Sequence, residues 1–88
     1  METMTEDYNV RAQIAYNLQD AQEELSGIIQ GFRPDSEIDE DEFRVRMAHL
    51  YGHLNTAWNM RNASGEEFEA AGGQQREAWR QFPTDIDL

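Results

Sequence analysis

The sequence predicts an all-α protein, an antiparallel helical hairpin followed by a shorter third helix, similar to a three-helix bundle. Two observations predict this class. Apolar residues recur at alternating spacings of three and four along most of the chain, which is the period of helices with one buried face. Helix-capping sequences precede these stretches, and Gly or Pro follows them. At 88 residues, the chain is expected to form one domain, residues 1–88.

The first helix is predicted over about residues 5–30. Thr3 or Thr5 is expected to cap its start, and Gly31 followed by Pro34 marks its end. Its apolar residues form one narrow stripe at about 100° per residue. The stripe consists of Val10, Ile14, Leu18, Ala21, Leu25, Ile28 and Phe32.

The second helix is predicted over about residues 39–62, after a short polar linker. Asp39 is the expected N-cap, with Glu42 three residues later. The apolar spacing here is close to that of a heptad seam, which favours left-handed packing against another helix. Across both helices we expect seven residues to form the packing seams: Ile14, Leu18, Leu25, Met47, Leu50, Leu54 and Trp58.

The third helix is predicted over about residues 65–82. A capping box begins at Ser64, and a proline follows the last apolar position. Gly72 and Gly73 weaken the middle of this segment by roughly 1 kcal/mol each relative to alanine, so they either allow a close helix approach or break the helix. Residues 83–88 are expected to be an acidic tail.

The two long helices bury only the seam between them, and the third helix has too few apolar residues to cover the rest of that seam. The usual remedy for such a hairpin is self-association into a four-helix bundle. We therefore expect a homodimer.

The composition and the charge argue against nucleic acid and membranes as partners. Eighteen acidic residues against seven arginines and no lysine give −11, which disfavours nucleic acid because phosphates are bound through Lys and Arg. No apolar run is long enough for a membrane span, so no membrane partner is expected. The acidic N-terminus is unlike a signal peptide and the chain has no Cys, which predicts a cytoplasmic location.

Most enzyme classes lack their usual motifs in this sequence. There is no glycine-rich nucleotide loop, no nucleophile elbow, and no Cys or Lys for covalent catalysis. We therefore expect a non-enzymatic protein without a cofactor. It would act through contact with a protein partner that the sequence does not identify.

Four residues are the candidates for a partner-binding face: Arg46, His49, His53 and Trp79. The two histidines are four residues apart on the second predicted helix, which is a known metal-ligand spacing. A third ligand is missing, and Arg46 opposes a cation nearby. The sequence therefore predicts no metal site.

The stretch from Arg44 to Tyr51 reads Arg-Val-Arg-Met-Ala-His-Leu-Tyr. It resembles the Arg-x4-His-x-Tyr motif of HEPN-type helical ribonucleases. The resemblance implies that Arg44 and His49 form a catalytic pair supported by Tyr51, and it makes a ribonuclease one alternative function.

A second alternative follows from the acidic stretch Asp35–Glu42, which holds six carboxylates in eight residues. Such a surface can mimic the phosphates of DNA and inhibit a basic DNA-binding protein. The simpler interpretation is a solvated linker and a helix N-terminus, where the helix dipole stabilises anions.

Overall fold

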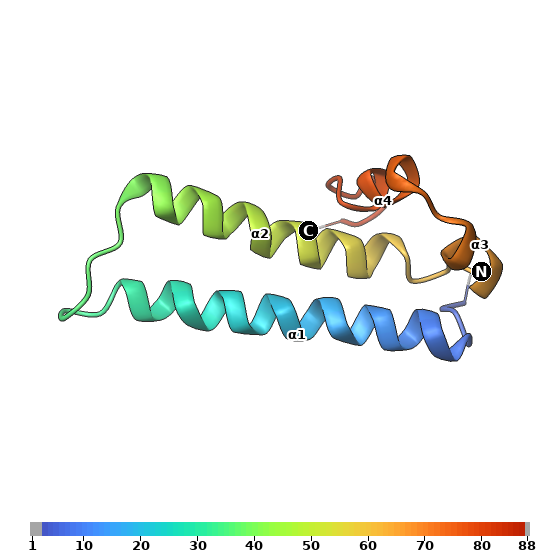
Figure 1. Cartoon of the computed structure of the whole chain (residues 1–88), viewed down its shortest axis with the longest axis horizontal. Coiled ribbons are helices and arrows are strands. Elements are labelled where there is room, and N and C mark those ends of the chain that lie inside the picture. The colour runs from blue at the N-terminus through green and yellow to red at the C-terminus, as the bar shows by residue number, and fades with distance from the viewer. Residues whose placement is uncertain (1–2, 88) are drawn as a thin grey trace.

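A computed structural model describes residues 3–87, and all regular structure there is helical (Figure 1). Helices α1 (Tyr8–Gly31) and α2 (Glu40–Asn59) run antiparallel, side by side. Two short helices follow: α3 (Gly65–Ala70) near the start of α1, and α4 (Gly73–Trp79) against α2. The predicted all-α class is confirmed, with two long helices packed against each other, whereas two short helices follow where one was predicted.

The start of α1 differs from the prediction. Asp7 is the N-cap, and its Oδ1 accepts a hydrogen bond from the Val10 backbone N–H at 3.0 Å. Thr5 is buried instead, and its backbone N–H donates to the Arg61 carbonyl at 2.7 Å. The chain before α1 is therefore tied to the end of α2, so the helix begins at Tyr8.

The predicted start of α2 is confirmed. Asp39 is its N-cap, because its Oδ1 accepts a hydrogen bond from the Glu42 backbone N–H at 2.8 Å. The helix ends at Asn59, three residues before the predicted boundary, where the Met60 and Arg61 N–H groups bond carbonyls of the last turn.

The third helix predicted over 65–82 is divided into two short helices, so of the two outcomes expected for Gly72 and Gly73 the break is the one observed. The capping box at Ser64 is present, with hydrogen bonds to and from Glu67 at 3.0 and 3.1 Å. However, the backbone becomes extended at Ala71 and Gly72, and a separate helix, α4, begins at Gly73. Glycine loses the most backbone entropy in a helix, so two adjacent glycines favour this break.

The core consists of two clusters along the hairpin. One joins Val10, Met60, Ala63 and Trp79, and the other joins Ala21, Ile28 and Leu50. Of the seven expected packing residues, Leu50 is buried and Ile14, Met47 and Trp58 are partly buried. Leu18, Leu25 and Leu54 remain 41–47% exposed, so that part of the prediction is wrong for the isolated chain.

The tail predicted over 83–88 is attached to the hairpin as far as the structure describes it, to residue 87. Asp85 accepts hydrogen bonds from the Trp58 indole N–H at 2.9 Å and from the Arg61 guanidinium at 2.7 Å. The Arg61 guanidinium also lies 3.9 Å from the centre of the Trp58 ring. We call residues 80–86 the C-terminal strap, because this segment lies along the second half of α2.

The molecule is elongated, with extents of 47 × 27 × 21 Å and a radius of gyration of 15.1 Å. A compact domain of this length has a radius of about 12 Å. Within residues 3–87, no helix combines the length and the apolar character needed to cross a membrane.

Candidate functional site

Apolar side chains left exposed by the hairpin form a row on each long helix. On α1 the spacings between successive members are seven, four and three, as in a heptad seam. On α2 they are four and three. We call these residues the apolar flank: the exposed Leu18, Leu25 and Ile29 of α1, Phe32 directly after α1, the exposed Tyr51 and Leu54 of α2, and the partly buried Met47 of α2.

The two rows lie on the same side of the hairpin. Viewed from the N-terminus of each helix, each row is rotated in the same direction away from the buried residues of that helix. When two helices run antiparallel, rows rotated in the same direction lie on the same side of the pair. Phe32 also contacts α2 directly, because its ring meets edge to face with that of Phe43, which packs on the core, with centroids 5.1 Å apart. The flank therefore forms one continuous apolar surface across both helices.

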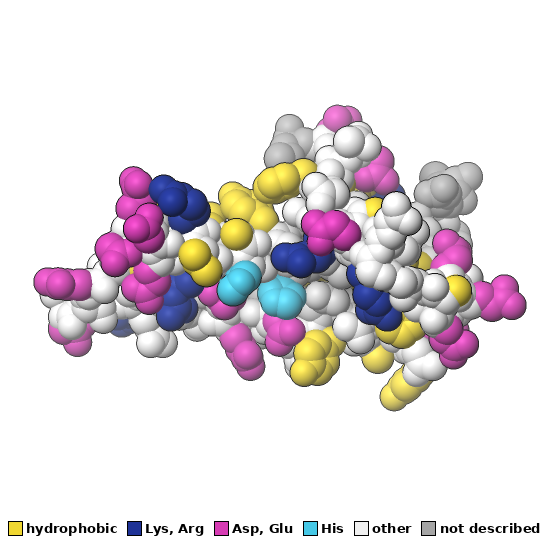
Figure 2. All heavy atoms as spheres, turned by 45° about the horizontal axis from the view of Figure 1, so that its top comes forward, with side chains coloured by type: hydrophobic (Ala, Val, Ile, Leu, Met, Phe, Trp, Pro, Cys, Tyr) yellow, Lys and Arg dark blue, Asp and Glu magenta, His cyan; other side chains and the backbone are white. Residues whose placement is uncertain are grey.

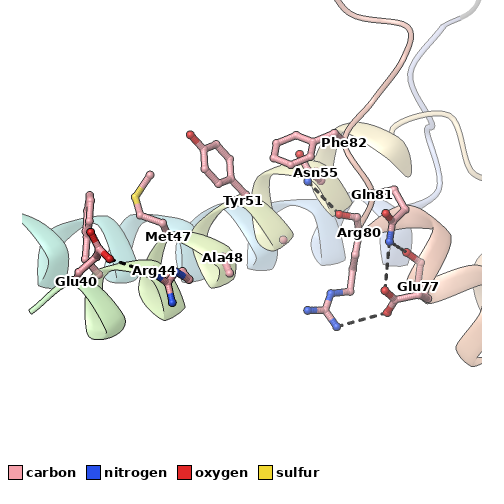
Figure 3. A pocket seen from close by; sticks show the side chains of 12 residues that line it. Glu40, Arg44, Met47, Ala48, Tyr51, Asn55, Glu77, Arg80, Gln81 and Phe82 are labelled. Carbon is pink, nitrogen blue, oxygen red and sulfur yellow. Dashed lines mark hydrogen bonds and ion pairs between the residues drawn. The ribbon is translucent and has the colours of Figure 1, made fainter.

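A groove of about 740 Å³ runs beside the α2 row, between that helix and the C-terminal strap (Figure 3). Met47, Ala48 and Tyr51 line it, and Phe82 of the strap lies against Tyr51 with ring centroids 5.2 Å apart. The charged groups at its edges form two pairs, which are Arg44 with Glu40 at 3.3 Å and Arg80 with Glu77 at 3.7 Å. Because these charges are paired locally, the groove suits apolar groups rather than a charged ligand.

The two histidines lie on the other side of α2, adjacent to each other on the surface (Figure 2). His49 is exposed and His53 is partly buried, and both line a depression of about 330 Å³ together with Arg80. The Nδ1 atom of His53 lies 3.1 Å from Oδ1 of Asn17 on α1.

Arg46 lies on this same side of α2 and is paired with carboxylates. Its guanidinium lies 3.4 Å from Glu42 and 3.9 Å from Glu24 of α1. Three of the four predicted partner-binding residues, Arg46, His49 and His53, therefore belong to one side of α2, where Arg46 forms pairs with both long helices.

Trp79 does not belong to a binding face, which corrects the prediction for this residue. Its side chain is only 8% exposed, packs with Val10 and Met60, and is the buried residue of α4. The Asn59 side chain donates to the Trp79 carbonyl at 2.7 Å. Aromatic residues at helical spacing are often core, and here the ring attaches the C-terminal part to the hairpin.

The ribonuclease motif is not assembled within one chain. Helix α2 is continuous, so Arg44 and His49 point about 140° apart, as five residues at about 100° each require. Arg44 is paired with Glu40 and Asp41, whereas His49 lines the depression on the other side. Tyr51 lies in the groove with Arg44.

The acidic residues do not form a single row on the side drawn in Figure 2. Acidic side chains are scattered over this side: they lie toward both ends of the molecule and also in its middle, beside the histidines and an arginine. A DNA mimic needs carboxylates spaced along one exposed face, so this side of the molecule does not favour that alternative.

Two contributors to these surfaces were missed by sequence reasoning. Asn17 is a buried polar residue in the seam of α1, and Asp85 of the strap binds Trp58 of α2. A signal for Asn17 was its spacing of seven from the buried Val10. No comparable local signal exists for the strap.

Comparison with protein-family models, with curated proteins and with solved structures finds no match to this chain. The functional conclusion therefore depends on the surfaces described above.

Proposed function

We propose that this chain is a small, acidic, non-enzymatic protein that acts in the cytoplasm through protein–protein contacts, and that it binds a second copy of itself through the apolar flank. Pairing the flanks of two hairpins gives a four-helix bundle, the usual arrangement for helices that expose apolar seams. A two-fold axis makes such a surface complementary to itself.

The observation that carries this proposal is the accessible surface of the single chain. It is 6,851 Å², whereas a monomeric protein of 10.2 kDa has about 5,300 Å². The excess of about 1,500 Å² is nearly twice the roughly 800 Å² that each partner buries in a standard interface. A dimer through the flank would bury a large part of this excess.

The composition of the flank supports a second copy as the partner. Its members are aliphatic or aromatic, and Leu18, Leu25, Ile29 and Phe32 are each 46–62% exposed. Dimer interfaces of identical chains have more apolar cores than transient interfaces. The histidine-bearing side faces away from the flank, so in the dimer it stays available to a further protein partner.

Analytical ultracentrifugation tests this proposal. The wild type is expected to sediment with twice the 10.2 kDa chain mass, and Leu25→Glu as a monomer, because a carboxylate in an apolar interface is left unpaired. Tyr16→Glu is the matched control, because Tyr16 is 60% exposed on α1 away from the flank. A monomeric wild type, or equal dissociation by both variants, would contradict the proposal.

A further inference from the structure

Asn17 occupies a position in the hairpin seam where an apolar residue would be expected. It is 8% exposed and lies between Val10 and Ala21 in the buried line of α1. Its side-chain N–H donates to the Gln13 carbonyl at 3.0 Å, and its Oδ1 lies 3.1 Å from Nδ1 of His53. A buried amide is costly unless it is satisfied, so these two bonds are the reason that Asn17 is tolerated.

These bonds fix the tautomer of the His53 ring. Because the Asn17 amide N–H is used by Gln13, the amide presents its oxygen to His53, and that oxygen can only accept. Nδ1 of His53 must therefore carry the proton and donate. In the neutral ring, Nε2 is then unprotonated and has a free lone pair. A histidine that binds a metal typically has this arrangement, in which the other ring nitrogen donates to a protein oxygen.

We propose that His49 and His53 form a binding site for a divalent transition-metal ion that favours imidazole, such as Ni²⁺ or Zn²⁺, with Asn17 as the positioning residue. The two rings lie one helical turn apart on α2 and are adjacent on the surface (Figure 2). Imidazole nitrogens suit these ions. Water would fill the remaining coordination positions, because residues 3–87 hold no group of three or more candidate ligands.

The charges around this pair permit a cation. Arg80 lines the same depression, but its guanidinium lies 3.7 Å from Glu77. Arg46, further along this side of α2, is paired with Glu24 and Glu42. The chain as a whole carries −11, and a field of that sign raises the local concentration of cations.

Titration calorimetry of the full chain with NiCl₂ and, separately, ZnCl₂ tests the site. We expect the wild type to bind one ion per chain. In His49→Ala, His53→Ala and the double variant, we expect the affinity to fall to that of non-specific binding by surface carboxylates. Equal affinity in the wild type and the double variant would identify an adventitious ion only and overturn the proposal. No binding of either ion by the wild type would overturn it as well.

Asn17 is tested with two substitutions that separate positioning from folding. Asn17→Leu removes the oxygen but fills the seam, so we expect a stable hairpin whose metal affinity falls roughly tenfold, the effect typical of a lost orienting partner. Asn17→Asp keeps an acceptor for Nδ1–H and is expected to retain the affinity. Equal affinity in the wild type and a folded Asn17→Leu chain would contradict the positioning role.

Discussion

Replacing Trp79 with alanine is expected to detach the C-terminal part of the chain from the hairpin. Trp79 is 8% exposed and is the buried residue of α4. A tryptophan buries roughly 150–250 Å², and at about 25 cal/mol per Å² this corresponds to about 4–6 kcal/mol. Measured Trp→Ala losses in cores run about 3–5 kcal/mol, and we expect Trp79→Ala to lower the free energy of unfolding by that amount.

Denaturant unfolding followed by circular dichroism measures this loss, and amide hydrogen exchange locates it. A seven-residue helix does not persist without tertiary contacts, so the α4 amides are expected to lose protection. Amides around Ala21, Ile28 and Leu50 are expected to keep most of theirs, since those residues form the other cluster.

The matched control is Gln75→Ala, an exposed position on the same helix, which is expected to change stability by no more than about 0.5 kcal/mol. A loss below about 1 kcal/mol for Trp79→Ala, with the α4 amides still protected, would refute the structural role of this tryptophan. In that case Trp79 would return to the candidate partner-binding residues.

Three further predictions concern the strap, the short helices and the charge. Hydrogen bonds from Trp58 and from Arg61 lower the pKa of Asp85 below 3.8. The contribution of Asp85 to strap attachment is therefore fully present above pH 3.8 and is lost as the pH falls through the lower folded value. The pH dependence of the Trp58 indole N–H resonance measures this loss, and Asp85→Asn is the control that does not titrate. A transition midpoint at or above pH 3.8 would contradict the prediction. A Cβ at Gly65 would overlap the carboxylate of Asp7, the cap of α1, so Gly65→Ala is expected to lower stability by about 1 kcal/mol. A Cβ at Gly73 would lie in open space, so Gly73→Ala is expected to raise stability by up to about 1 kcal/mol. Thermal melts measure both variants, and equal effects would refute this reasoning. Added NaCl is expected to strengthen self-association in sedimentation runs, because it screens the repulsion between chains of −11 each, and weakening would count against that reasoning.

The sequence predicted the starts of α2 and α3 correctly, but it misplaced the start of α1 and three of the seven packing residues. Asp39 and Ser64 were identified as caps because capping depends on residues within one turn. Leu18, Leu25 and Leu54 were expected in the core because they follow the helical period. That period gives the angle of a residue around its helix, but it does not say how much of the apolar stripe the neighbouring helix covers.

The candidate sites depended on contacts between distant segments. The adjacency of His49 and His53 follows from helical spacing, and the structure agrees. The contact between Asn17 and His53 joins residues 36 apart and depends on the register of the hairpin, for which no local signal exists. The hydrogen bond between Asp85 and Trp58 joins residues 27 apart, and the burial of Trp79 against Val10 also joins distant segments. Neither contact has a local signal in the sequence.

The flank-to-flank dimer is tested most directly by isotope-filtered NMR on a mixture of ¹³C-labelled and unlabelled chains. Cross-peaks between chains are expected from the methyl groups of Leu18, Leu25 and Leu54. None are expected from Val45, which is 55% exposed on α2 away from the flank. Cross-peaks from Val45 alone, or no cross-peaks between chains at millimolar concentration, would contradict self-association through the apolar flank.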